Sequence, residues 1–259
     1  MTHSCKVIAH RGASGQAPEN TLAAIHKALD IGVDMIEIDV RQTRDGAIVL
    51  LHDRTLNRTT NGKGRVAKQT LKEVQALDAG SWFDPRFATE GVPTLEEAMQ
   101  LIDGQCGLLI EIKDGDLLHP IFCKRLVRLI QQHKAHSWVV VQSFSTKVLR
   151  AVYRLDPAIE LNKLIHYAVP GLPVYNDGTV RFGNVFADRL TTAVNLNSRH
   201  FNRRVVRKLR THKRATYLWT VDDPEAMQRL IKLKADGIIT NYPDRLKAVL
   251  KDMHQPQPA

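Results

Sequence analysis

The chain alternates regularly between short apolar runs and longer amphipathic segments. Runs rich in Val and Ile predict strands, and the segments between them are long enough for helices, which is the pattern of repeated strand–helix units. The predicted strands lie near residues 7–10, 35–40, 107–113, 138–143, 159–165, 193–197, 216–221 and 237–240. Eight strands close a (β/α)8 barrel, and 259 residues suffice for one large core. The sequence therefore predicts a single TIM-barrel domain over residues 1–259.

Two segments depart from this alternation. Residues 53–93 contain glycine-rich turns and one short helical pattern but little strand signal, which predicts a small insertion after the second barrel strand. Residues 166–191 are rich in Pro and Gly, which predicts an irregular loop near the strand ends.

The composition narrows the class of protein. No apolar run approaches the roughly 18 to 20 residues that a bilayer span needs, and no signal-peptide pattern precedes the first strand. The three cysteines include no Cys-x-x-Cys pair, so neither a disulfide framework nor a zinc knuckle is predicted. We expect a cytoplasmic protein without stable membrane insertion.

Two predicted strands carry three acidic residues. Glu37 and Asp39 share one face of their strand, and Glu111 lies on the next strand along the barrel. Like charges at this separation repel each other unless a cation lies between them. Carboxylate oxygens suit a hard divalent ion, so these three residues are the predicted ligands for Mg²⁺ or Ca²⁺.

Histidines and cations end the same strands. His10 and His52 each terminate an apolar strand, and imidazole suits acid and base roles near neutral pH. Arg11 and Lys113 are positioned to bind phosphoryl oxygens. The remaining nine histidines are interpreted as structural or merely exposed. Trp219, on the seventh strand, is either an apolar wall beside a bound polyol or a core aromatic.

Taken together, these motifs resemble the glycerophosphodiester phosphodiesterase family, in the family's order over nearly the whole chain. The matching stretches are His10–Gly12, Pro18–Thr21, Glu37–Val40, Asp45–Gly46, His52–Asp53, Arg58–Gly64, Pro93–Glu97, Glu111–Lys113, Trp219–Val221 and Asp236–Thr240. By resemblance, His10 and His52 are the acid–base pair, and Glu37, Asp39 and Glu111 bind the metal. Arg11 and Lys113 then bind the phosphate.

The resemblance also implies a substrate class. Family members hydrolyse glycerophosphodiesters such as glycerophosphocholine to glycerol 3-phosphate and the free alcohol, and family analogy allows a cyclic phosphate intermediate. Residues 166–191 match no family motif, and Asn241 stands where an acidic residue often follows the last strand. The order in which the two histidines act is not predicted.

Two other functions remain open. A related lyase or a lysophospholipase D would use the same residues on lipid phosphodiesters, although the predicted loops are mostly polar. Alternatively, residues 199–214, with eight Lys and Arg and no Asp or Glu, could bind nucleic acid or an anionic membrane surface. Such a helix is usually the solvated outer layer of a barrel, so no nucleic acid is predicted as partner. The oligomeric state is not predicted.

Overall fold

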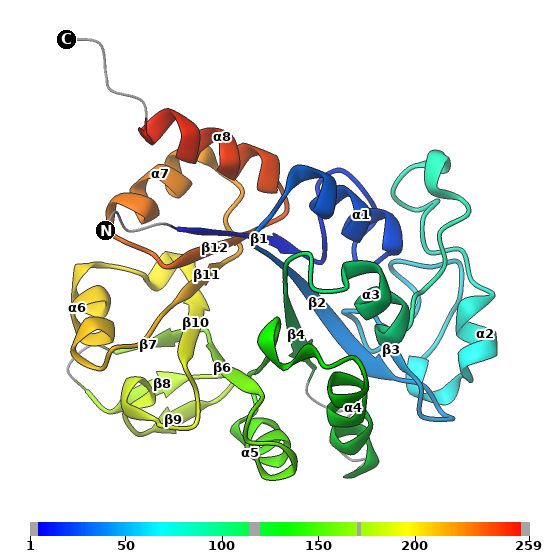
Figure 1. Ribbon diagram of the computed structural model, residues 1–259, viewed down its shortest axis with the longest axis horizontal. Helices are drawn as coiled ribbons and strands as arrows, with labels where there is room; N and C mark the ends of the chain where they lie inside the picture. Colours follow the sequence, from blue (N-terminus) through cyan, green and yellow to red (C-terminus); the bar gives the residue numbers. More distant parts are fainter. Residues whose placement is uncertain (1–4, 114–119, 170–171, 255–259) are drawn as a thin grey trace.

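The computed structural model describes residues 5–113, 120–169 and 172–254. Its main sheet has the order β1-β12-β11-β10-β6-β5-β4-β2-β3, and pairing between β1 and β2 closes it into a barrel. The eight barrel strands run parallel, and helices surround them (Figure 1). The predicted TIM barrel is therefore confirmed.

The elements lie close to the predicted positions. The barrel strands are β1 (Lys6–His10), β2 (Met35–Gln42), β4 (Gly107–Ile112), β5 (Val139–Ser143), β6 (Glu160–Ile165), β10 (Ala193–Asn197), β11 (Tyr217–Trp219) and β12 (Gly237–Thr240). The helices are α1 (Leu22–Ile31), α2 (Leu71–Gln75), α3 (Leu95–Ile102), α4 (Pro120–Gln132), α5 (Thr146–Leu155), α6 (Arg203–Thr211), α7 (Pro224–Lys232) and α8 (Pro243–His254). Short 3-10 turns occupy Val66–Lys68, Pro85–Phe87, Ala135–Ser137, Val185–Ala187 and Ser198–His200. No helix among the described residues is long and apolar enough to cross a membrane.

Between β2 and α3 the chain forms a small additional region outside the barrel. Strand β3 (Ile48–Leu50) folds back antiparallel onto β2, and α2 follows within residues 53–93. This region has a small apolar cluster of its own, separate from the main core. Its buried members are Val49, Leu51, Leu56, Val66, Val74, Ala79 and Val92. The hairpin returns the chain to the β2 rim, which carries His52 to the barrel mouth.

The prediction of an irregular loop over 166–191 is wrong. This segment contains a three-stranded antiparallel sheet of β7 (Tyr167–Ala168), β8 (Val174–Asn176) and β9 (Val180–Phe182). No α-helix is found in its described residues, unlike the other barrel connections. The strands are only two or three residues long, too short for a period-2 pattern to be recognised in the sequence.

Side chains alternate between the two faces of each strand, and those on the inward face fill the barrel. Ile8, Met35, Leu109, Val140, Tyr217 and Ile239 form an apolar cluster distinct from the main core. Two residues further along their strands, Ile8, Met35 and Leu109 are followed by His10, Glu37 and Glu111. Because side chains repeat every second residue, these polar groups share the inward face one step nearer the carboxyl ends of the strands. The active face of a TIM barrel lies at those ends.

Candidate active site

A tight turn after β1 brings Arg11 back across the barrel mouth. Arg11 and Gly12 have φ angles of 56° and 79°, in the left-handed region. A Cβ atom at position 12 would lie 2.6 Å from the backbone carbonyl carbon of Ala24, so glycine is required there. The turn points the Arg11 backbone N–H at Glu37 Oε2, 3.1 Å away.

Three buried carboxylates converge at this face. Glu37 and Asp39 lie on β2, and Asp39 is the register partner of Glu111 on β4. One oxygen from each of the three lies within 4.8 Å of the others. Their exposed fractions are 1%, 0% and 7%, so water does little to screen their repulsion. The cluster can hold a hard cation.

Two side-chain cations contact Asp39. Arg11 Nε lies 3.0 Å from its Oδ2 atom and Lys113 Nζ 2.8 Å from its Oδ1 atom. Asn20 donates from Nδ2 to Asp39 Oδ2 at 2.9 Å, and the next residue, Thr21, caps α1. Burial raises the pKa of Asp39, but Lys113 and Arg11 outweigh burial and hold this pKa below its usual value.

The other two carboxylates are less well neutralised. Burial, reinforced by the charges of Asp39 and Glu111, raises the pKa of Glu37 well above its usual value. Burial also raises the pKa of Glu111 to about 7, although Lys113 donates to its Oε1 atom at 2.6 Å. Three carboxylates thus face two side-chain cations, which leaves an excess of negative charge in a buried site.

A hydrogen-bond relay fixes the tautomer of His10. Its Nδ1 atom lies 2.7 Å from Asn241 Oδ1, while Asn241 Nδ2 donates to Asp222 Oδ2 at 2.7 Å. Since a carboxylate only accepts, Asp222 orients the amide so that its oxygen faces the imidazole. His10 Nδ1 therefore carries the hydrogen and Nε2 is left with its lone pair. Burial, with Arg11 nearby, lowers the pKa of His10 to about 4.

His52 is held by a carboxylate instead of an amide. Its Nδ1 atom donates to Asp53 Oδ1 at 2.7 Å, and Arg58 Nε donates to Asp53 Oδ2 at 2.8 Å. The Arg58 hydrogen bond lowers the pKa of Asp53 to about 2, so this acceptor is ionised. Arg58 also contacts Glu19, which accepts from Arg11 Nη1 at 2.7 Å. Burial lowers the pKa of His52.

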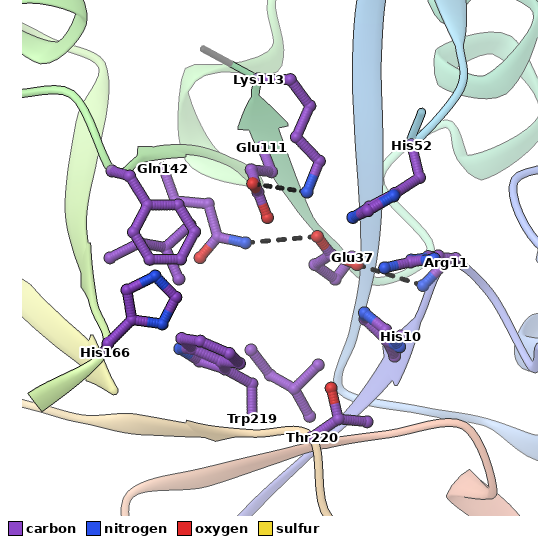
Figure 2. A pocket seen from close by; sticks show the side chains of 13 residues that line it. His10, Arg11, Glu37, His52, Glu111, Lys113, Gln142, His166, Trp219 and Thr220 are labelled. Carbon is purple, nitrogen blue, oxygen red and sulfur yellow. Dashed lines mark hydrogen bonds and ion pairs between the residues drawn. The ribbon is translucent and has the colours of Figure 1, made fainter. Parts of the chain in front are cut away.

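A pocket of about 240 Å³ joins these groups. Its walls include His10, Arg11, Glu37, His52, Glu111, Lys113 and Trp219, and Asp39 lies buried beside them, bound to Arg11 and Lys113. Figure 2 shows His10, Arg11 and His52 on one side and His166 and Trp219 on the other. The structure therefore brings all eight predicted site residues together.

The opposite wall is aromatic and was largely missed. Phe144 stacks on His166 with ring centroids 4.9 Å apart, and Trp219 meets both rings edge-on. Trp219 thus lines the pocket, as one of its two predicted interpretations required. His166, one of the nine histidines interpreted as structural or exposed, is exposed and also lines the pocket. It follows β6 directly, and the same strand-end position singled out His10 and His52.

Two polar partners were also missed. Gln142 on β5 donates to Glu37 Oε1 at 3.3 Å, and it occupies the position paired with Glu111 in the barrel register. That inward position was its only sequence signal, because an amide does not indicate chemistry by itself. Asn241 was noted only as a departure from the family pattern, whereas it contacts His10.

Comparison with known proteins identifies the family of the chain. Residues 10–245 match the glycerophosphoryl diester phosphodiesterase family. A glycerophosphodiester phosphodiesterase from Caldanaerobacter subterraneus subsp. tengcongensis is 39% identical, covering 93% of this chain and 95% of that protein. One from Bacillus subtilis is 33% identical, covering 94% and 86%. The structure of an Oleispira antarctica phosphodiesterase in complex with the product sn-glycerol 3-phosphate is 30% identical, with a TM-score of 0.84 and coverage of 95% and 96%. The protein is therefore an enzyme of the glycerophosphoryl diester phosphodiesterase family.

Proposed function

We propose that this enzyme hydrolyses glycerophosphodiesters to sn-glycerol 3-phosphate and an alcohol, with His10 and His52 as its acid–base pair. The observation that carries the proposal is the convergence of both imidazoles and three buried carboxylates on one pocket. The relatives named for this activity and the product bound to the Oleispira phosphodiesterase support it.

A divalent cation fits the carboxylate cluster. Burial, together with the neighbouring carboxylates, raises the pKa of Glu37 and Glu111, and a cation among the three oxygens would oppose this effect by stabilising the ionised forms. Carboxylate oxygens favour Mg²⁺ or Ca²⁺ over softer metals, so Glu37, Asp39 and Glu111 would be the ligands. When bound, such an ion would supply positive charge to a phosphoryl oxygen.

The two cations and the two histidines have different proposed roles: phosphate binding and proton transfer. Arg11 and Lys113 line the pocket and would bind the non-bridging phosphate oxygens, whose charge grows as the phosphorus is attacked. Each histidine has its Nδ1 atom engaged, by Asn241 in His10 and by Asp53 in His52. The two Nε2 atoms are then the ones available to the substrate. One would take the proton of the attacking hydroxyl, and the other would protonate the leaving alkoxide.

A coupled assay for glycerol 3-phosphate tests the proposal. The substrates are glycerophosphocholine, glycerophosphoethanolamine and lysophosphatidylcholine, each with Mg²⁺, with Ca²⁺ or with a chelator. We expect release of glycerol 3-phosphate from the first two, loss of activity with the chelator, and recovery when metal is restored. Background rates for the wild type, or full activity in His10→Ala or Glu37→Ala, would show the assignment to be wrong. Cleavage of the lysolipid would give choline and lysophosphatidate, so it is followed by choline release instead. Turnover of only the lysolipid would favour the lysophospholipase D alternative.

A further inference from the structure

The three-stranded sheet β7-β8-β9 has one packed face and one open face. In its antiparallel register Val174 pairs with Phe182 and Asn176 with Val180, so these four side chains share a face. Tyr175 points to the opposite face, where it packs against the core and lies 5.9 Å from the buried Lys163 ammonium. The inner face therefore fixes the sheet to the barrel, and on the other face only Tyr167, the register partner of Asn176, is seen to pack on a neighbouring ring, that of His200.

The outer face of this sheet exposes large apolar side chains. On this face Phe182 is 85% exposed and Val180 58%. Leu172, two residues before β8, is 63% exposed and lies close by, because the backbone N–H of Gly183 donates to the carbonyl oxygen of Pro173 at 2.7 Å. These are the three most exposed large apolar side chains among the described residues. Neighbouring apolar side chains open to water mark an interaction site more often than isolated ones do. The predicted loops were mostly polar, so this surface was not anticipated.

The open face borders the barrel mouth and a basic helix. His166, which lines the catalytic pocket, immediately precedes Tyr167 of β7, and Tyr167 packs on His200 at 5.3 Å between ring centroids. Asn184, just after β9, lies 3.4 Å from His212 at the end of α6. Figure 1 shows β7, β8 and β9 beside α6.

The charge around the face is strongly positive. Residues 166–214 hold ten Lys and Arg but only two acidic residues, Asp177 and Asp188. Asp177 is buried and paired with Lys163 and Arg181, so it contributes little negative potential. Arg203, Arg207 and Arg210 are exposed along α6 and line a groove between α6 and α7.

We propose that this surface, made of Leu172, Val180 and Phe182 with the arginines of α6, docks the enzyme reversibly onto an anionic phospholipid bilayer. Aliphatic and aromatic side chains would enter the interface while the guanidinium groups contact lipid phosphates. The same pattern disfavours two other occupants. Only Phe182 offers a ring for a nucleic-acid base to stack on, whereas Leu172 and Val180 are aliphatic and suit a bilayer interface instead. Two copies meeting on this face would bring two basic helices together.

Vesicle co-sedimentation of the full-length enzyme tests this proposal. The vesicles are pure phosphatidylcholine, or phosphatidylcholine with about 30% phosphatidylglycerol, at low and physiological salt. We expect salt-sensitive binding to the anionic vesicles only. Phe182→Ser and Val180→Ser should each weaken binding about tenfold, and so should the charge-removing pair Arg203→Ser with Arg207→Ser.

Ile121→Ser on α4 is the matched control, because Ile121 is 47% exposed and lies outside the surface. It should bind vesicles as the wild type does. All variants should keep the wild-type melting temperature and turnover of a water-soluble glycerophosphodiester, which separates this inference from the proposed function. No binding by the wild type at low salt, equal binding by Phe182→Ser and Ile121→Ser, or a dimer that Phe182→Ser dissociates would each overturn it.

Discussion

The two sides of the candidate active-site pocket are held in different ways. On the side of β1, β2 and β4, nearly every polar group is fixed by a short hydrogen bond or ion pair, as in the relay from Asp222 through Asn241 to His10. On the other side, Phe144, His166 and Trp219 contact one another through ring faces and edges. Hydrogen bonds fix atoms in direction, whereas apolar packing fixes only shape. We therefore expect the charged side to set the rate and the aromatic side to set substrate fit.

The largest effect should come from removing one charge of the carboxylate cluster. Glu37→Gln keeps the shape of the side chain but removes a proposed metal ligand, so kcat should fall about a thousandfold. Glu96→Gln is the matched control, because Glu96 is 56% exposed and lies on α3. Both variants are measured by release of glycerol 3-phosphate at saturating metal. Equal activity of the two would refute the importance of the cluster.

The next effect concerns the orientation of His10. Asn241→Leu removes the acceptor of the Nδ1–H group, so the ring loses its fixed tautomer. We expect kcat to fall about tenfold to a hundredfold with KM nearly unchanged, and Asn241→Asp to recover part of the loss by restoring an acceptor. Steady-state kinetics separates the two constants. A rise in KM without loss of kcat would instead assign Asn241 to substrate binding.

Metal binding should depend on pH. In the metal-free enzyme the pKa of Glu111 is raised to about 7, so below that pH the cation must displace a proton. Affinity should rise by at least about tenfold per pH unit below this pKa, because Glu37, whose pKa is also raised, adds to the protons that the cation displaces. Calorimetric titration of Mg²⁺ or Ca²⁺ in buffers of different ionisation enthalpy measures both the affinity and the released protons. Affinity independent of pH would contradict this account of the cluster.

The smallest effect is expected from the aromatic side. Trp219→Ala opens the wall without touching the carboxylates or the His10 relay. KM should rise about fivefold to tenfold while kcat changes little, and the size of the rise should vary with the alcohol group of the substrate. A loss of kcat as large as that of Glu37→Gln would show that the aromatic side also sets the rate, contrary to our expectation.

The same division describes what could be predicted from sequence. The charged side was predictable because strand alternation places Glu37, Glu111 and His10 inward at the ends of apolar strands. The hairpin that returns His52 to the mouth also had a local signal, the Asp45-Gly46 turn.

The supporting contacts had no such signal. Asn241 and Asp222 are separated by 19 residues and meet only because β11 and β12 are neighbours in the barrel. The strands of the sheet beside the mouth pair over only two or three residues each, so their exposed apolar face was not predictable. Local pattern therefore predicted the groups that we propose to react, and tertiary pairing determined what orients them.

The most direct test of the central claim compares two leaving groups in the histidine variants. Turnover of glycerophosphocholine should fall at least about a hundredfold in both His10→Ala and His52→Ala. With a nitrophenyl glycerophosphodiester, whose leaving group needs no proton, one variant should recover most of its rate and the other should not. Recovery by a single variant identifies the acid and the base. Near wild-type turnover of glycerophosphocholine by either variant would contradict the proposed acid–base pair.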